Sequence, residues 1–212
     1  MNIQTRKNGL LTAVTAITAL GFGSAATAVP INASYDGSLC PGQCTDFATA
    51  GYSVTGGAVI SPAQTVSGDY KTPGEDTGNS GNVLSYNVTS EQDVPGGAVN
   101  SIVVSNLANA FELYWGSVDS YNVIEFLING DATGYDPFTG SDASALAGGI
   151  GSPKNYGFDG YFSFNGDFNQ VRLSSSDGVA FEVATASVPE PGSLALLGLG
   201  LAGLGLRYRR LS

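Results

Sequence analysis

The chain has 212 residues, which is enough for one domain, or two small ones, together with targeting segments. It contains 18 acidic residues, 8 basic residues and no histidine. Only three of the basic residues lie between residues 29 and 190, whereas all 18 acidic residues do, and this negative charge disfavours binding to nucleic acid or anionic lipid. The lack of histidine excludes Ser-His-Asp and Cys-His nucleophiles and the common zinc hydrolase sites.

The N-terminal segment has the order of a secretory signal peptide. Arg6 and Lys7 precede an apolar run over residues 10–23, and small residues then lead to Ala26-Thr27-Ala28. This order predicts a signal helix over residues 1–28 with cleavage after Ala28, and a short buried helix is the alternative. We therefore expect three parts: the signal at 1–28, an extracellular domain at 29–187 and a C-terminal segment at 188–212.

Two cysteines follow the predicted cleavage site. Cys40 and Cys44 flank Pro41-Gly42-Gln43, and a Pro-Gly pair favours a tight turn. Export places them in an oxidising compartment, so we expect a small-loop disulfide between them. A zinc site would need more ligands, and redox motifs more often have two residues between the cysteines.

The region 29–187 has the pattern of an all-β domain. Short alternating or β-branched segments are separated by Gly, Asn, Asp and Ser, which predicts an antiparallel β-sandwich or jelly roll. We expect strands at residues 52–60, 83–88, 101–105, 111–115, 122–128, 161–164, 168–174 and 179–183, and long loops at 67–82 and 130–157.

Two of these expectations concern pairing. Residues 111–115 and 122–128 should form a hairpin whose aromatic and aliphatic side chains enter the core. Residues 161–164, 168–174 and 179–183 should form a meander, because Asn165-Gly166 and Asp177-Gly178 favour the positive φ angles of tight hairpin turns.

Candidates for catalysis are few. Glu112 and Glu125 fall on strands expected to pair, and two carboxyl groups about 5 Å apart can cleave glycosides. Both fall on the face opposite the aromatic core residues, so we interpret them as solvent-facing strand residues. We expect no enzyme activity and no cofactor, and a carboxylate glycosidase is the less favoured alternative.

One loop has the composition of a calcium site. Residues 129–134 read Asn-Gly-Asp-Ala-Thr-Gly, with Asp136 and Asp142 nearby, and they provide several oxygen ligands. The final bidentate glutamate of an EF-hand loop is absent, so a turn rich in Asn, Asp and Gly is the favoured interpretation and calcium the alternative.

The C-terminal segment has three successive parts. Pro189 and Pro191 hold Glu190 on an extended linker, and residues 194–206 form an apolar run about 20 Å long as a helix, shorter than a hydrocarbon core of about 30 Å. The run is followed by a basic cluster that should stay on the cytoplasmic side, namely Arg207, Arg209 and Arg210. A short, weak transmembrane helix of this kind fits a temporary membrane anchor.

This arrangement resembles the PEP-CTERM sorting signal of Gram-negative bacteria and cyanobacteria. The resemblance implies recognition by a membrane-embedded exosortase, removal of the tail, and association with the cell surface or exopolysaccharide matrix. Residues 114–122, 173–176 and 180–183 are similar to stretches of exosortase-dependent surface proteins. Related chains often follow Phe-Glu with Asp-Asn, where this chain has Ala184-Thr185. A permanent single-pass anchor and a lipid-anchor signal are the alternatives, but the former needs no Pro-Glu-Pro and the latter lacks terminal arginines.

These features predict an exported, non-enzymatic surface or matrix protein whose partners are the secretion machinery, an exosortase, the inner membrane transiently, and exopolysaccharide. A carbohydrate-binding module is the alternative, because β-sandwiches can present exposed aromatic side chains to sugars. Its candidate contacts are Tyr114, Tyr121, Tyr135 and Tyr156.

Overall fold

The computed structural model describes residues 30–37, 40, 42–89, 101–151, 157–176 and 180–186. The predicted signal peptide and the predicted sorting tail, with Ala28 and the arginine cluster, lie outside these residues. Every ladder between named strands is antiparallel, and the strands form two sheets. The all-β, antiparallel fold class is therefore confirmed. No helix within the described ranges is long and apolar enough to cross a membrane.

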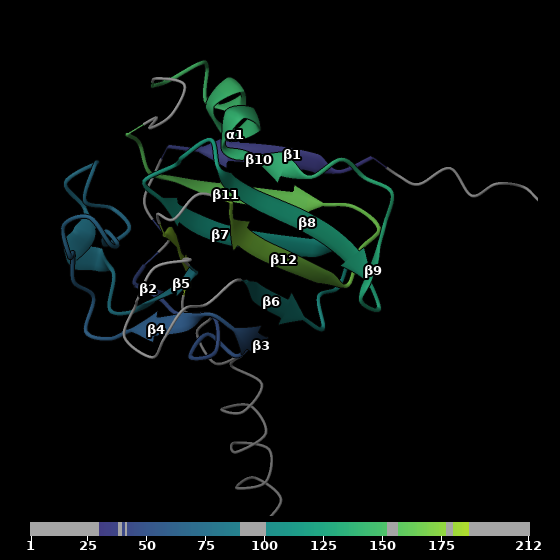
Figure 1. Cartoon of the computed structure of the whole chain (residues 1–212), viewed down its shortest axis with the longest axis horizontal. Coiled ribbons are helices and arrows are strands. Elements are labelled where there is room, and N and C mark those ends of the chain that lie inside the picture. The colour runs from purple at the N-terminus through teal and green to yellow at the C-terminus, as the bar shows by residue number, and fades with distance from the viewer. Residues whose placement is uncertain are drawn as a thin grey trace, which may run out of the picture.

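The first sheet has seven strands. Its order is β1 (Asn32–Asp36), β11 (Gly160–Asn165), β7 (Ala110–Gly116), β13 (Phe181–Ala186), β5 (Tyr86–Thr89) and β4 (Ala58–Ile60), and β2 (Cys44–Thr45) also pairs with β13. Strand β13 is therefore an interior strand that lies between β7 and β5. Figure 1 shows three strands of this sheet, β1, β11 and β7, side by side.

The second sheet has six strands. Its order is β10 (Phe138–Thr139), β8 (Asn122–Ile128), β12 (Gln170–Ser175), β6 (Ile102–Ser105) and β3 (Ser53–Gly56), and β9 (Asp131–Ala132) pairs with β8. A 3-10 turn, η1 (Ser80–Asn82), lies in the loop before β5.

The core lies between the inner faces of the two sheets. The apolar side chains predicted to share one face of β7 are buried there, with Trp115 0% exposed. From the second sheet, Ile124 and Phe126 of β8 join the same cluster. The ring of Trp115 lies 4.7 Å from that of Phe181, measured between centroids. The alternation of apolar and polar residues thus correctly identified the inward-facing positions.

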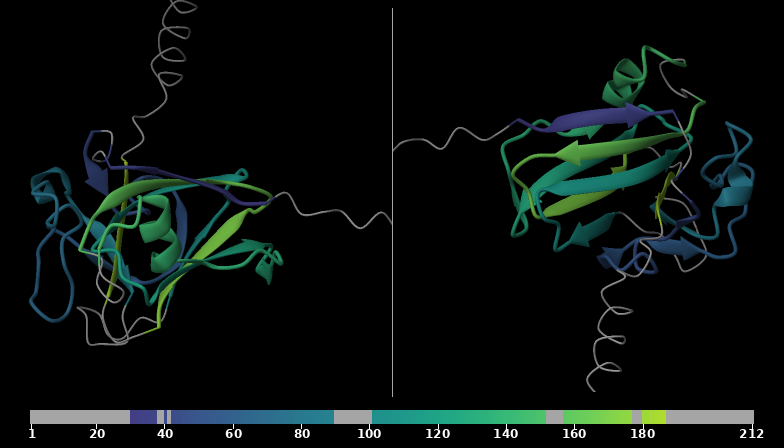
Figure 2. Two further views of the ribbon diagram at one scale, coloured as in Figure 1. Left: turned by 90° about the horizontal axis from the view of Figure 1, so that it is seen from above. Right: turned by 180° about the vertical axis from the view of Figure 1, so that it is seen from behind.

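A helix, α1 (Gly140–Leu146), closes one end of the space between the sheets (Figure 2). Ala143 of this helix is completely buried in the core. The helix begins with a capping box, in which the hydroxyl of Thr139 accepts from the Asp142 N–H and the Asp142 carboxylate accepts from the Thr139 N–H. The expectation of a long loop over 130–157 was therefore wrong at this point.

The predicted pairing of consecutive strands was also wrong. Strands β7 and β8 belong to different sheets and do not form a hairpin. Likewise β11, β12 and β13 alternate between the first, second and first sheet, so they do not form a meander. The chain crosses the sandwich at each of these connections.

Gly166 shows why the turn signal misled. The Asn165-Gly166 pair does not close a hairpin, because β11 and β12 lie in different sheets. A Cβ atom at Gly166 would lie 2.5 Å from Cδ1 of Ile31. A larger residue there would require the Ile31 side chain to shift, so this glycine accompanies the close approach of another segment and not a hairpin turn.

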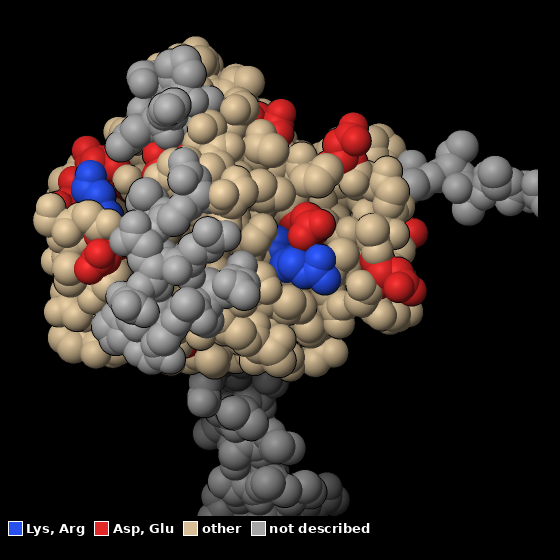
Figure 3. All heavy atoms as spheres, in the orientation of Figure 1, with Lys and Arg blue, Asp and Glu red and all other residues tan. Residues whose placement is uncertain are grey.

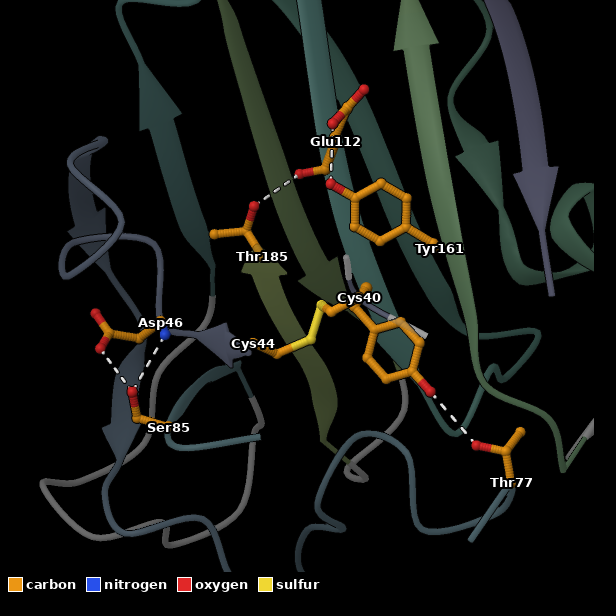
Figure 4. Close-up of a disulfide and its surroundings, with 9 residues drawn as sticks. Cys40, Cys44, Asp46, Thr77, Ser85, Glu112, Tyr161 and Thr185 are labelled. Atoms are coloured by element: carbon orange, nitrogen blue, oxygen red, sulfur yellow. Dashed lines mark hydrogen bonds between the residues drawn. A yellow bond between two sulfur atoms is a disulfide. The ribbon is translucent and has the colours of Figure 1, made fainter. Parts of the chain in front are cut away.

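A second apolar cluster covers the outer face of the first sheet. Cys40 and Cys44 form a disulfide within it, with their Cα atoms 5.7 Å apart, and both residues are buried. Figure 4 shows the disulfide beside β13, close to Thr185 and Tyr161. Tyr161 belongs to the same cluster and donates from its hydroxyl to Glu112 at 2.9 Å. The disulfide therefore closes a short loop directly before and into β2, which is held to the sheet by its pairing with β13.

Candidate functional site

A cleft of about 520 Å³ opens beside the first sheet, and we call it the acidic cleft. It lies between the loop of residues 65–75, the β7–β8 connection and β13. Its lining consists of residues 65–71, Glu75, Ser117, Asp119, Tyr121 and Glu182. Four of these residues carry carboxyl groups and one, Lys71, carries an ammonium group.

The walls of the cleft are held together by a buried aspartate outside it. Asp159 is 2% exposed, and its carboxylate accepts from the Ser117 N–H at 2.8 Å and from the Thr77 N–H at 3.1 Å. These two bonds connect the β7–β8 connection to the loop that follows Lys71. Burial raises the pKa of Asp159, and the N–H donors and the charge of Asp76 act in opposite directions on that pKa.

Glu182 is the most deeply buried carboxyl group of the cleft. It lies on β13 opposite Gly116 of β7 and is 2% exposed. Its Oε1 accepts from the Lys71 N–H at 2.8 Å, whereas its Oε2 has no hydrogen-bond partner. Burial raises the pKa of Glu182 well above its ordinary value, and the charge of Asp119 raises it further. The side chain therefore favours its neutral, protonated form.

Asp119 lies on the β7–β8 connection and is 3% exposed. Its Oδ2 accepts from the Tyr121 hydroxyl at 2.6 Å, and its Oδ1 has no partner. Burial raises the pKa of Asp119 to about 6, although the Tyr121 hydrogen bond and the charge of Lys71 lower it. Glu182 and Asp119 therefore prefer different protonation states near neutral pH.

The basic side chains of the described residues are already engaged. Lys71 pairs with Asp76, and Arg172 pairs with Glu125 at 3.2 Å. On the face drawn in Figure 3, the atoms of basic residues (blue) lie next to atoms of acidic residues (red). Among the charged side chains of the described residues, carboxylates therefore outnumber basic groups.

The tyrosines proposed as glycan contacts do not form one surface. Tyr114 is 2% exposed, its ring packs in the second apolar cluster, and its hydroxyl lies 3.4 Å from that of Thr77. Tyr121 lines the acidic cleft, whereas Tyr135 lines a separate groove of about 540 Å³ next to Phe138. Tyr156 lies outside the described residues.

The structure also separates the two glutamates considered for catalysis. Glu112 is on β7 of the first sheet and accepts from Tyr161, and Glu125 is on β8 of the second sheet and pairs with Arg172. The prediction that their strands pair was wrong. These two residues therefore do not form a carboxylate pair.

The loop considered for calcium is used for local structure. Asp142 caps α1, and Asp131 is exposed on β9. Within the described residues, no three His, Cys, Asp or Glu side chains are grouped so that they could hold a metal ion.

Sequence reasoning missed Asp119, Asp159 and Glu182 as site residues. The sequence feature that could have pointed to Asp119 and Glu182 was the similarity of residues 114–122 and 180–183 to stretches of exosortase-dependent surface proteins. The register of β13 against β7 places Glu182 opposite Gly116, and this register brings the two stretches to the same cleft.

The fold and site define a two-sheet β domain with a cleft rich in carboxyl groups, and comparison with known families accounts for the end of the chain. The family model of the PEP-CTERM protein-sorting motif matches residues 187–210. Residues 187–210 therefore carry a PEP-CTERM protein-sorting motif, and this motif indicates exosortase-dependent sorting to the cell surface. No curated protein and no solved structure matches the chain significantly.

Proposed function

We propose that this chain is an exported, non-enzymatic protein of the cell surface or exopolysaccharide matrix, which an exosortase shortens at its C-terminal tail. The position of the motif carries this proposal. The motif begins at residue 187, directly after β13 ends at Ala186. Because β13 lies between β7 and β5, the domain requires this strand, and cleavage at Pro-Glu-Pro leaves it intact.

The three parts of the tail have different tasks in this proposal. Pro189 and Pro191 hold Glu190 in an extended segment that a processing enzyme can reach. The apolar run 194–206 holds the chain temporarily in the inner membrane, and the arginine cluster stays on the cytoplasmic side. The acidic domain is then on the outside before the tail is removed.

Substitutions in each part test this division of tasks. Changing Pro189, Glu190 and Pro191 to alanine should leave the protein exported and membrane-held but unprocessed. Changing Arg207, Arg209 and Arg210 to serine should weaken membrane retention instead. Truncation after Ser187 is the control, and it should release soluble domain. A tag directly after Ala28 precedes β1 and reports all three outcomes by cell fractionation. Identical fractionation of all variants and wild type would refute the proposal.

Carbohydrate binding is a second candidate function, and the acidic cleft favours it. A cleft of about 520 Å³ lies in the range of small-molecule sites, which is about 300–1,000 Å³. Its lining is rich in hydroxyl and carboxyl groups that can bind sugar hydroxyls. The tyrosine surface first considered for this function gives little support, because Tyr114 is buried.

A further inference from the structure

Two buried oxygen atoms of the acidic cleft have no hydrogen-bond partner. Oε2 of Glu182 and Oδ1 of Asp119 belong to side chains that are 2% and 3% exposed, and both residues line the cleft. Leaving such an atom unpaired destabilises the folded state, and native structures contain few of them. Two in one cleft indicate that a ligand supplies the missing partners.

Both side chains are held in place, so the site exists before a ligand binds. Glu182 is on an interior strand and is fixed by the Lys71 N–H at 2.8 Å. Asp119 is fixed by the Tyr121 hydroxyl at 2.6 Å, and its own N–H donates to Asn122 at 3.3 Å. A preformed site loses little conformational entropy on binding.

The two carboxyl groups offer different hydrogen-bonding capacities. Glu182 favours its protonated form and so presents an O–H donor, whereas Asp119 is ionised above about pH 6 and presents an acceptor. A hydroxyl group both donates and accepts, so a polyol can satisfy both atoms. Asp69 and Glu75 also line the cleft and repel carboxylate or phosphate ligands.

The size and walls of the cleft fit a sugar better than an ion. Calcium takes about 6–8 oxygen ligands around a single small ion, whereas the cleft has a volume of about 520 Å³. Val66 is 36% exposed and Tyr121 is half-buried, and both line the cleft. These side chains provide apolar surface for the C–H groups of a sugar ring.

We propose that the acidic cleft binds a neutral segment of a glycan, with Asp119 and Glu182 forming hydrogen bonds to its hydroxyl groups. This inference rests on the second candidate function, and it assigns the binding to two carboxyl groups instead of a row of tyrosines. The sorting proposal does not depend on it.

Calorimetric titration of the exported protein, produced from the full-length chain, tests the inference. The probes are neutral oligosaccharides of glucose, galactose, mannose and N-acetylglucosamine, with glucuronic acid as the anionic counterpart of glucose. We expect at least one neutral probe to bind and glucuronic acid not to bind. Asp119→Asn should weaken binding about tenfold or more, because an ionised acceptor is lost. Glu125→Gln on the second sheet is the matched control and should bind like wild type.

Two substitutions of Glu182 distinguish hydrogen bonding from a structural role. Glu182→Gln keeps a donor and should bind nearly as well as wild type, whereas Glu182→Met lacks both donor and acceptor and should bind about tenfold or more weakly. If the Met variant does not fold, Asp119→Asn still decides the question. The inference is overturned if no neutral probe binds, if glucuronic acid binds more tightly than glucose, or if Ca²⁺ alone binds and Asp119→Asn abolishes that binding. Cleavage of a bound probe, lost in Glu182→Gln, would support the ligand class but contradict the non-enzymatic function.

Discussion

Replacing Asp119 with asparagine should change how the stability of the domain depends on pH. Asp119 is 3% exposed, and burial raises the pKa of its carboxyl group from 3.8 to about 6. This difference corresponds to about 3 kcal/mol, because each pKa unit represents about 1.36 kcal/mol. Asparagine has nearly the shape of the neutral acid but does not ionise.

The sign of the effect follows from the direction of the pKa change. Below pH 3.8 the carboxyl group is protonated in both the folded and the unfolded chain, so the folded state bears no ionisation cost. Between pH 3.8 and about 6 it ionises first in the unfolded chain, and stability falls as pH rises. Above about pH 6 the cost of about 3 kcal/mol is fully present. Wild type should therefore lose stability relative to Asp119→Asn as pH rises through this window.

Urea unfolding followed by tryptophan fluorescence measures this difference. Trp115 is the only tryptophan of the chain and is completely buried, so its emission reports unfolding directly. The titratable groups around Asp119, namely Glu182, Asp76 and Lys71, are the same in both proteins. Asp131→Asn, at an exposed position, is the matched control for removing one carboxylate. If the free energies of unfolding of wild type and Asp119→Asn differ by the same amount at about pH 4 and about pH 7, the reasoning is refuted.

Three further substitutions test the fold. Replacing Cys40 and Cys44 together with serine should lower the free energy of unfolding by about 2 kcal/mol in urea, since the disulfide closes a short loop, and no loss would contradict this role. Gly116→Ala would place a Cβ atom 2.7 Å from Cα of Pro73, so it should lower the thermal unfolding midpoint and reduce the free energy of unfolding by roughly 1–3 kcal/mol. An unchanged midpoint would contradict the close packing of Gly116 against Pro73. Thr139→Ala removes the N-cap of α1 and should lower the free energy of unfolding in urea by about 1 kcal/mol. An unchanged free energy of unfolding would mean that the cap does not stabilise the domain.

The sequence predicted the strands better than it predicted their pairing. The alternating pattern of β7 correctly placed Phe111, Leu113 and Trp115 in the core. The same alternation arises whether the next strand pairs alongside or crosses to the facing sheet, because both arrangements bury one face. Pairing depends on contacts between distant segments, such as β7 with β11 and β13, and local turn signals do not contain this information.

The outer face of β7 shows why the site was misjudged. Tyr114 alternates with core residues and was therefore expected at the surface. The loop of residues 65–79 and the disulfide segment cover this face, so Tyr114 is buried in the second cluster. Asp119 and Glu182 are 63 residues apart in the sequence, and the register of β13 against β7 brings them to one cleft. The local sequence could, however, have predicted the start of α1, because Thr139 and Asp142 have the spacing of a capping box.

The most direct test of the central claim is the C-terminus of the exported protein, determined by mass spectrometry in a strain with an active exosortase. The account predicts a chain that retains β13 through Ala186 and lacks residues 192–212, and a full-length tail in the matched strain without the exosortase. A mature protein that keeps residues 192–212 in the strain with the enzyme would contradict the account and identify the tail as a permanent anchor.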